Sequence, residues 1–391
     1  MQRLPTIDEA LALVLERVQP LASEQVALAQ AAGRCLAEDA AALVDLPPFH
    51  SSAMDGYAVR AADTPGTLRV VAESAAGRPT ETVLGAGEAI AISTGAVVPE
   101  GADAVIPVEH TDGGKETVVV ERCERGANIR PRGGDTHAGD AVARAGQVLR
   151  PVHLGALASC GLTHVRCGRL PSAAVLATGT ELRRPGEPLG PGQIYESNTV
   201  LLAAQLRLLG IETEVLEPAR DDPAATREAL ERGLAADVLV TSGGVSVGEH
   251  DHVRGALADL GAEEVFWRVA LRPGKPVAFS VRGSTLVFGL PGNPVSSLVG
   301  FELFVRPALR ALQGAHAPEP ELLPGILGAP LRRNPQRDEL VRARLEDGVL
   351  RPVSGQESHM IARAAAANAL VLVRNGDGEL AQGSQVSWLA L

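Results

Sequence analysis

Short apolar runs alternate with amphipathic segments over residues 172–314, and this alternation is the clearest structural signal in the chain. Strands are expected where apolar, often β-branched residues follow one another, at 173–177, 211–216, 237–241, 264–269, 276–281 and 285–289. Helices are expected where apolar residues recur at helical spacing, at 200–209, from Pro223 onward, at 253–260 and at 295–312. Strands separated by helices in this way form a mostly parallel sheet with helices on both faces.

The rest of the chain follows other patterns. Thr6 and Glu9 form a capping box for a helix with one apolar face that ends before Pro20. Short β-like runs between Gly/Pro turns follow, and they return after a Pro/Gly-rich linker at 314–330. We therefore expect a multidomain α/β protein with an N-terminal helical and linker domain (1–44 and 146–171), an inserted β-rich domain (45–145), a central α/β domain (172–314) and a small C-terminal β domain (325–391).

Composition and charge narrow the range of functions. The 391 residues are 45% apolar but only 3% aromatic, so the cores are expected to consist of Ala, Val and Leu. A net charge of −11 without a dense basic cluster argues against nucleic-acid binding. No apolar run suits a membrane span and the N-terminus lacks a signal pattern, so we expect a cytoplasmic protein without membrane contact. The four cysteines form no C-x-x-C pair and indicate neither zinc nor disulfides.

Residues 237–251 give the strongest chemical signal. An apolar run leads into a loop with Gly243, Gly244 and Gly248 ahead of a helix, an arrangement that presents backbone N–H groups to a phosphate. The loop also contains two hydroxyls and two acids that could hold Mg²⁺ against phosphates, namely Ser242, Ser246, Glu249 and Asp251. The alternative is a tight turn whose glycines serve only the backbone geometry.

Three further polar, glycine-containing loops follow predicted strands, at 178–182, 271–276 and 289–294. Ligands of such sheets bind at the carboxyl ends of the strands. A charge-assisted hydrogen bond contributes roughly 1.5–3 kcal/mol, whereas micromolar binding requires about 8 kcal/mol, so several loops must act together. We expect the four loops to form one pocket for a polyanion and a metal, with Asn293 capping the helix that begins at Pro294. Taken singly, the loops are also explained as ordinary turns.

The β-rich region has polar turns of its own. Asp55 lies on a turn with Ser52 and Tyr57, Thr94 begins another turn, and Asp135 follows a Gly-Gly pair. Each is typical of an ordinary turn. Nothing in the composition places these residues beside the loops of the α/β domain.

Taken together, these motifs resemble the molybdopterin molybdenumtransferase family, which comprises the bacterial MoeA proteins and the related E domain of gephyrin. The resemblance extends from about Leu4 to the C-terminus. Its strongest matches, in the family's order, are 52–58 (Ser-Ala-Met-Asp-Gly-Tyr-Ala), 192–198 (Gly-Gln-Ile-Tyr-Glu-Ser-Asn), 242–251, 275–276 (Lys-Pro) and 290–294 (Leu-Pro-Gly-Asn-Pro).

The resemblance implies the last step of molybdenum cofactor synthesis. Adenylylated molybdopterin and molybdate would be the substrates, Mg²⁺ the cofactor and AMP a product. It further implies an elongated homodimer of four-domain subunits with the site between the α/β domain of one subunit and the β-rich domain of the other. Molybdopterin adenylyltransferase and molybdoenzyme maturation proteins follow as candidate partners.

The same resemblance assigns residues to the site. The matching catalytic positions are Asp55, Thr94, Asp135, Glu181, Asp237 and Asp251, and the metal positions among them are Glu181, Asp237 and Asp251. The matching substrate-binding positions are Ser242, Gly243, Gly244, Ser246, Arg272, Lys275, Pro276, Pro291, Asn293, Arg342 and Ser358. Of these, Lys275 and Pro276 match the molybdate-binding turn, and Arg342 and Ser358 match residues that help to hold molybdate.

Three positions depart from the family pattern. Arg272 stands where lysine is usual, which keeps the charge but changes its geometry. Thr180 replaces an aspartate common before Glu181, which removes one oxygen ligand, and Glu196 replaces aspartate or asparagine.

Other functions fit parts of the chain. A molybdopterin adenylyltransferase and a hydrolase of the competence-damage type resemble the α/β domain, but both lack the Met-Asp-Gly-Tyr segment at 54–57. A non-catalytic scaffold like gephyrin is a third alternative. The retained Asp237, Asp251 and Lys275 favour catalysis over that alternative.

Overall fold

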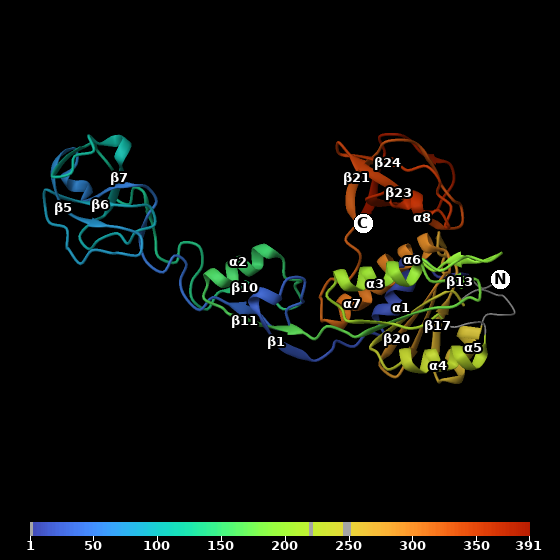
Figure 1. Cartoon of the computed structure of the whole chain (residues 1–391). Coiled ribbons are helices and arrows are strands. Elements are labelled where there is room, and N and C mark those ends of the chain that lie inside the picture. Colours follow the sequence, from blue (N-terminus) through green and yellow to red (C-terminus); the bar gives the residue numbers. More distant parts are fainter. Residues whose placement is uncertain (1–2, 219–221, 245–251) are drawn as a thin grey trace.

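The computed structural model of the chain describes residues 3–218, 222–244 and 252–391. These residues form an elongated molecule with a β-rich domain at one end and an α/β domain with a C-terminal β domain at the other (Figure 1). A small domain around helix α2 (Pro151–Ser159) lies between them. No helix in these described ranges is long and apolar enough to span a membrane.

The α/β domain contains a six-stranded sheet in the order β15–β12–β16–β20–β19–β17. Its strands are β15 (Thr213–Val215), β12 (Ala173–Ala177), β16 (Val238–Ser242), β20 (Thr285–Leu290), β19 (Ala278–Arg282) and β17 (Glu263–Trp267). The first four strands pair in parallel, whereas β19 is antiparallel to both of its neighbours. The predicted mostly parallel sheet is therefore confirmed, and β17 runs in the same direction as β20.

Successive side chains of each strand point to opposite faces of the sheet, and each face has its own helices. Val238 and Val240 face one helical layer, while Leu239 faces the other. The first layer consists of α1 (Ile7–Leu15), α3 (Asn198–Leu208), α6 (Pro294–Gly300), the π-helical turn η4 (Phe301–Val305) and α7 (Arg306–Leu312). The second layer consists of α4 (Pro223–Gly233) and α5 (His252–Asp259).

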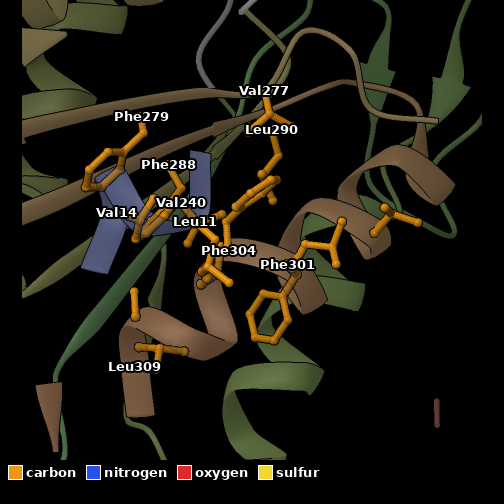
Figure 2. Packing of buried hydrophobic residues seen from close by; sticks show 14 of the residues in the cluster. Leu11, Val14, Val240, Val277, Phe279, Phe288, Leu290, Phe301, Phe304 and Leu309 are labelled. Atoms are coloured by element: carbon orange, nitrogen blue, oxygen red, sulfur yellow. The ribbon is translucent and has the colours of Figure 1, made fainter. Parts of the chain in front are cut away.

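Helix α1 corrects the predicted domain boundaries. The capping box of Thr6 and Glu9 is present as expected, but the helix does not belong to a separate N-terminal domain. Leu11 and Val14 are buried among Phe304 and Leu309 in the core of the α/β domain (Figure 2). Burial of each such side chain contributes roughly 1.5–3 kcal/mol to the free energy of folding. The helix gains this contribution by packing on the α/β domain. The boundary assigned at 1–44 is therefore wrong for the helix.

The chain leaves the α/β domain after α1 and returns only at β12. On the way it forms the small domain, in which β1 (Ser23–Ala27) pairs with β11 (His164–Gly168) and β2 (Ala40–Ala41) with β10 (Ala141–Ala143). The β-rich domain beyond it has a five-stranded sheet of β7 (Ala104–Pro107), β4 (Gly56–Val59), β6 (Glu88–Ile92), β5 (Gly66–Ser74) and β8 (Thr117–Val120). The segment that enters the β-rich domain and the segment that leaves it pair as two short antiparallel strands, β3 (Ser51–Ser52) and β9 (Ile129–Arg130).

The C-terminal domain is a small β-barrel. Its strands are β23 (Asp338–Glu346), β24 (Val349–Pro352), β21 (Leu323–Leu327), β27 (Gln385–Ala390) and β25 (Ala369–Val373), and the pairing of β25 with β23 closes the ring. Strand β18 (Leu271–Arg272) comes from the α/β domain and pairs in parallel with the start of β23. The barrel is thus attached to the α/β domain by backbone hydrogen bonds as well as by the linker.

Candidate active site

Three of the four predicted loops meet at the carboxyl edge of the sheet. They follow the neighbouring strands β12, β16 and β20. The backbone N–H of Thr178 donates to the carbonyl of Ser242 at 3.1 Å, and that of Gly243 donates to the carbonyl of Leu290 at 3.0 Å. The expected convergence of these loops is therefore present within one chain.

The two glycines after β16 are required by this close packing. Gly243 and Gly244 have φ angles of +89° and +66°, a region that side chains disfavour. A Cβ on Gly243 would lie 2.8 Å from the carbonyl oxygen of Thr178, and one on Gly244 would lie 2.3 Å from Val253. Loop geometry thus accounts for both glycines. The rest of the loop, including the predicted Ser246, Glu249 and Asp251, lies outside the described residues.

Asn198 joins two of these loops, a role that the sequence did not reveal. Its Nδ2 donates to Ser242 Oγ and to the carbonyl of Gly292, both at 2.7 Å. The side chain is buried, and its Oδ1 has no hydrogen-bond partner among the described residues. In the sequence, Asn198 was notable only as the last residue of the family motif at 192–198, so its loop-to-loop contact needed the three-dimensional structure.

The loop after β20 leads into α6 and meets the barrel. Asn293 occupies the predicted N-cap position of α6, but its side chain forms no capping hydrogen bond. Ser297 Oγ instead donates to the carbonyl of Pro291 at 2.6 Å and so fixes the turn from inside the helix. The N–H of Val295 donates to the carbonyl of Ser358 at 3.1 Å. Ser358, predicted to help hold molybdate, is therefore beside the first turn of α6, although it belongs to another domain.

Among the described residues, Glu181 is the predicted acid at this edge whose carboxylate is free to bind a ligand or a cation. Its carboxylate folds back over Gly179, because a Cβ on that glycine would lie 2.5 Å from Glu181 Oε2. The residue is exposed, and no residue that the structure describes forms an ion pair or hydrogen bond with its carboxylate. A carboxylate in this position can interact with a cation or with a proton of a ligand.

Asp237 requires a correction, because it lies at the opposite edge of the sheet. It immediately precedes β16, and at about 3.3 Å per residue the strand separates it from Ser242 by roughly 16 Å. Its carboxylate accepts two hydrogen bonds from Arg169, at 2.9 and 3.0 Å, and two from Ser172, at 2.7 and 2.8 Å. Asp237 therefore fixes the start of the strand and is not placed to bind the same metal as Glu181.

The pKa of Asp237 agrees with this structural role. Burial alone would raise it, but hydrogen bonds from Arg169 and Ser172 and the positive charge of Arg169 lower it below its ordinary value. The carboxylate is thus held in its charged form. A group committed in this way has little capacity to exchange protons with a substrate near neutral pH.

The donor set at the open edge fits a magnesium ion shared with a ligand. In the described ranges, no group of three His, Cys, Asp or Glu side chains is arranged to hold a metal by itself. Mg²⁺ bound with phosphates commonly takes one or two protein carboxylates and completes its shell with phosphate oxygens and water. Glu181 supplies one such carboxylate, and the other remaining candidate, Asp251, lies outside the described residues.

The turn that contains Arg272, Lys275 and Pro276 lies beside α6. It follows β17, whose carboxyl end is at the same edge, and a Cβ on Gly274 would lie 3.8 Å from the carbonyl oxygen of Ser296. Arg272 forms an ion pair with Glu339 of the barrel at 3.0 Å. Lys275 is exposed. The fourth predicted loop is therefore at the same edge of the sheet as the other three and lies close to α6, the helix that follows the loop after β20.

Arg268, which the sequence analysis did not select, also lies at the end of β17. Its φ of +76° is strained for a residue with a side chain, and its guanidinium stacks on Trp267 with 3.8 Å to the ring centroid. Backbone strain of this kind has no signature in a single sequence. Arg268 is an additional cation at the edge where the loops lie.

Arg342 is the second correction. It was expected to contact molybdate, but it is only 1% exposed. Its guanidinium donates to the carbonyls of Gly355, Glu357 and Met360 at 2.7, 3.2 and 3.0 Å. Burial lowers the pKa of this guanidinium. Arg342 therefore holds the barrel loop that contains Ser358, and its guanidinium is buried from solvent in the single chain.

The structure explains the role of one of the three residues that depart from the family pattern. Glu196 is buried, accepts a hydrogen bond from the N–H of Thr199 at 2.8 Å and another from its hydroxyl, and so stabilises the first turn of α3. Its replacement of the usual residue therefore affects the helix that presents Asn198. The carboxylate is not directed to a ligand.

Asp55, Thr94 and Asp135 lie in or beside the β-rich domain, at the other end of the molecule from these loops (Figure 1). Asp55 Oδ1 accepts a hydrogen bond from the N–H of Thr94 at 2.7 Å, so these two form one turn cluster. The N–H of Asp135 donates to the carbonyl of Leu46 at 2.9 Å, where the two chain segments enter and leave the domain. Within a single chain, these residues do not meet Glu181.

Comparison with known proteins accounts for all of these parts. The MoeA N-terminal region (domains I and II) matches residues 5–161, a probable molybdopterin binding domain matches residues 174–311, and the MoeA C-terminal region (domain IV) matches residues 324–391.

Individual relatives match over most of their length. Molybdopterin molybdenumtransferase 2 of Mycobacterium tuberculosis is 38% identical over 399 residues, which cover 97% of this chain and 98% of that protein. The molybdopterin molybdenumtransferase of Haemophilus influenzae is 40% identical over 315 residues, 79% of this chain and 78% of that protein. A crystal structure of a molybdopterin biosynthesis MoeA protein from Pyrococcus horikoshii OT3 superposes with a TM-score of 0.85 and 29% identity, covering all of both chains.

The domain order and the loops at the sheet edge thus define a class, multidomain proteins built around an α/β domain of the molybdopterin-binding type. Within that class, the chain belongs to the molybdopterin molybdenumtransferase family, a family of transferases. The resemblance noted from the sequence motifs is confirmed.

Proposed function

We propose that this chain inserts molybdenum into adenylylated molybdopterin, with molybdate as the second substrate, Mg²⁺ as cofactor and AMP as a product. The observation that supports this most is the joined loop edge, where the loops after β12, β16 and β20 contact one another and the Ser358 loop of the barrel contacts α6. Membership of the family supports molybdenum insertion as the reaction, and we assign the reaction to this loop edge.

The residues at this edge have distinct roles in the proposal. The loops after β16 and β20, fixed to each other by Asn198, form the floor for the phosphates of the substrate. Mg²⁺ bound beside Glu181 would offset the negative charge of those phosphates. Water attacks one phosphorus atom, the bond to the bridging oxygen breaks, and AMP leaves. The two dithiolene thiols then bind the molybdenum of molybdate, which Ser358 helps to hold, and their two protons leave with one oxide as water.

We further propose that the complete site forms between two copies of the chain. Asp55 and Thr94 lie at the far end of an elongated subunit, so they reach a Glu181 edge only if that edge belongs to a partner. A two-fold dimer would then contain two equivalent sites, each with residues from both subunits.

The reaction is tested by AMP release from adenylylated molybdopterin with Mg²⁺, in the presence and absence of molybdate. The expected result is AMP release that depends on molybdate, together with active cofactor, measured by reconstitution of an apo-molybdoenzyme. Binding of the substrate without AMP release would contradict the enzyme and favour a scaffold.

The shared site is tested by mixing two inactive variants, Glu181→Gln and Asp55→Asn. If each site combines Glu181 of one subunit with Asp55 of the other, mixed dimers contain one intact site. Random exchange of subunits should then restore about a quarter of the wild-type activity. The matched control mixes each variant with itself. Activity that stays at the level of the controls, although mass spectrometry shows mixed dimers, would contradict a shared site.

A further inference from the structure

An open groove of about 760 Å³ runs between helix α1 and strand β17 of the α/β domain. It is distinct from the loop edge around Glu181 and Asn198. Its helix wall is one stripe of α1, its strand wall is four consecutive residues of β17, and the N-terminal segment completes the lining. These parts are Glu9, Ala12, Leu13 and Glu16 of the helix, 264–267 of the strand, and 3–5.

The groove follows the backbone edge of β17. Successive side chains of a strand point to opposite faces of a sheet, so only the edge of the strand can present four consecutive residues to one cavity. Strand β17 is the last in the sheet order and pairs with β19 on its other side. In the described ranges, no loop or side chain is hydrogen-bonded to the backbone of residues 263–266. One row of N–H and C=O groups of this strand therefore faces the groove.

A β-bulge adds to this unpaired row. The register between β17 and β19 passes from Glu264–Ser280 to Phe266–Phe279, so Val265 is an extra residue on β17. A bulged residue is left out of the ladder with the neighbouring strand. Val265 lines the groove, and its backbone groups are available there for another chain.

The sheet of the β-rich domain shows how an edge is covered. The N–H of Val105 on β7 donates to the carbonyl of Ala127 at 2.9 Å, and the N–H of Asp112 donates to the carbonyl of Val119 on β8 at 3.2 Å. Folded proteins cover their edge strands in such ways because an open row of backbone groups pairs with other extended chains. The β17 edge has no such cover among the described residues.

The side chains around the groove select for apolar and basic residues. Leu4, Leu13 and Phe266 offer apolar surface, whereas acids outnumber cations in the lining by three to one. Two of these acids are compensated, because Glu9 pairs with Arg3 at 2.9 Å and Glu264 pairs at 2.7 Å with an arginine of α5.

Glu16 is the acid of the groove that is compensated least. It lies 3.6 Å from Arg17, and its side chain is 63% exposed. It is the C-cap of α1, and this helix has no basic residue in its last turn. An acid at a helix C-terminus is unfavourable, and a cation there is favourable, because the helix dipole is negative at that end. A lysine or arginine of another chain beside Glu16 would therefore be stabilised twice.

We propose that the β17 edge binds an extended segment of a partner protein in which apolar residues alternate with lysine or arginine. The segment is an added strand of the sheet, with main-chain hydrogen bonds to β17 and side chains in contact with α1. One of its cations pairs with Glu16. The groove reaches Trp267, on which Arg268 stacks, so the bound segment lies next to the carboxyl edge of the sheet.

The first test is fluorescence anisotropy of a dye-labelled peptide, Lys-Val-Lys-Val-Lys-Val-Lys with blocked ends, added to the full-length protein at low ionic strength. We expect saturable binding. Ala12→Arg should weaken it at least about tenfold, because a long cationic side chain from an exposed position of α1 enters the groove. The matched control is Ala158→Arg, at an exposed position of α2, which should stay within about twofold of the wild type. No saturable binding, or equal affinities for Ala12→Arg and the wild type, would overturn the proposal.

Modified peptides test the backbone and the charge separately. In an added strand, one set of alternate N–H groups faces β17 and the other faces away. Of two peptides N-methylated only at the valines or only at the lysines, one should therefore lose binding and the other keep it. The acidic peptide with Glu in place of Lys should bind at least about tenfold more weakly. Equal binding of the two methylated peptides, or of the acidic and basic peptides, would overturn the proposal.

Amide hydrogen exchange locates the bound peptide on the protein. Exchange should slow at residues 263–267 when the peptide is bound and stay unchanged at β7 of the β-rich domain. Slow exchange of 263–267 in the protein alone that becomes faster on dilution would assign this edge to a second copy of the chain, and so would overturn the proposal.

The outcome is separable from that of the proposed function, because these measurements need neither substrate nor metal. Peptide binding by a protein that releases no AMP would leave this surface standing and the reaction wrong. Molybdate-dependent AMP release by a protein that binds no peptide would leave the reaction standing and this surface wrong.

Discussion

The two edges of the central sheet differ in what their acids do. The carboxylate of Asp237 at the amino edge of β16 accepts four hydrogen bonds from Arg169 and Ser172, whereas the carboxylate of Glu181 at the carboxyl edge of β12 has no partner among the described residues. Both are acids beside neighbouring parallel strands, and both were assigned to one metal. Their position relative to strand direction, and not their chemical type, separates a structural acid from a candidate functional one.

Other residues repeat this contrast. At the amino edge, Thr285 Oγ1 is hydrogen-bonded to the carbonyls of Leu234 and Ala236 at 3.3 and 3.0 Å. These bonds fix the start of β20 to the segment that follows α4. At the carboxyl edge, Asn198 Oδ1 lacks a partner in the described ranges, and the glycines keep the loops close together without side chains. The named polar groups of the amino edge are thus paired within the protein, whereas Asn198 Oδ1 and the Glu181 carboxylate of the carboxyl edge have no partner among the described residues.

The largest difference is expected between Glu181→Gln and Asp237→Asn in the rate of AMP release. Loss of the Glu181 charge removes the proposed cation ligand and should lower the single-turnover rate about a hundredfold or more. Asp237→Asn should leave the rate of the folded enzyme unchanged. Both rates are measured at saturating Mg²⁺ and molybdate, with circular dichroism as the check on folding. Equal losses in the two variants would show that the edges do not differ in function.

A second comparison uses one glycine from each edge. Gly243 and Gly283 both have positive φ, but a Cβ on Gly243 meets the Thr178 carbonyl, whereas nothing lies within 4 Å of a Cβ on Gly283, in the turn before β20. Gly283→Ala should lower the free energy of unfolding by about 1 kcal/mol. Gly243→Ala should cost about 2–3 kcal/mol and reduce kcat/KM about tenfold, because the loops must separate. Urea denaturation and steady-state kinetics measure both, and equal effects would contradict the close packing of the loops.

A third comparison concerns Asn198→Ala and Thr285→Val. Each removes a side chain that donates to backbone carbonyls, so each should lower the free energy of unfolding by about 1–2 kcal/mol. Only Asn198→Ala should also raise KM for adenylylated molybdopterin, about tenfold, because the loops after β16 and β20 lose their connection. An unchanged KM in Asn198→Ala would reduce Asn198 to a purely structural residue.

The smallest effect is the pH dependence of stability that Asp237 contributes. Its folded pKa lies below its unfolded value of about 3.9, so the contribution is present above pH 4 and is lost as the pH falls through the folded pKa. Near neutral pH, the free energy of unfolding of the wild type should exceed that of Asp237→Asn by about 1–2 kcal/mol. The difference is small because Arg169 is partly exposed, so solvent screens the ion pair. Urea titrations at a series of pH values should show the two proteins converging in acid. A constant difference would contradict the assigned ion pair.

The sheet and its helices were predictable because their signals are local. Runs such as 173–177 and 238–240 are continuous apolar segments between turns, and the structure has strands at both. Convergence of three loops also followed from the sequence, since parallel strands that are neighbours must end together. The contact of the fourth loop with α6 did not follow, because strand order across the whole sheet is not a local property.

The errors had long-range causes. Asp237 is only a few residues before Ser242, and closeness in sequence concealed that a whole strand lies between them. Arg342 matched a family position, but three backbone carbonyls of one barrel loop occupy its guanidinium. The apolar face of α1 predicted a helix and could not say which of four domains would bury it. In each case, the deciding contact joins two separate segments of the chain, and hydrophobic periodicity does not predict such contacts.

The position of α1 has a consequence for how this chain is made. Ile7, Leu11 and Val14 pack against η4 and α7, so about 300 residues must be added after the helix before its partners exist. At ~5–20 residues per second, the ribosome needs about 15–60 s for that length. During this time the small domain and the β-rich domain can fold, while the apolar stripe of α1 stays exposed on the nascent chain. This interval is where a chaperone that recognises short apolar helices would have the greatest effect on the yield of the protein.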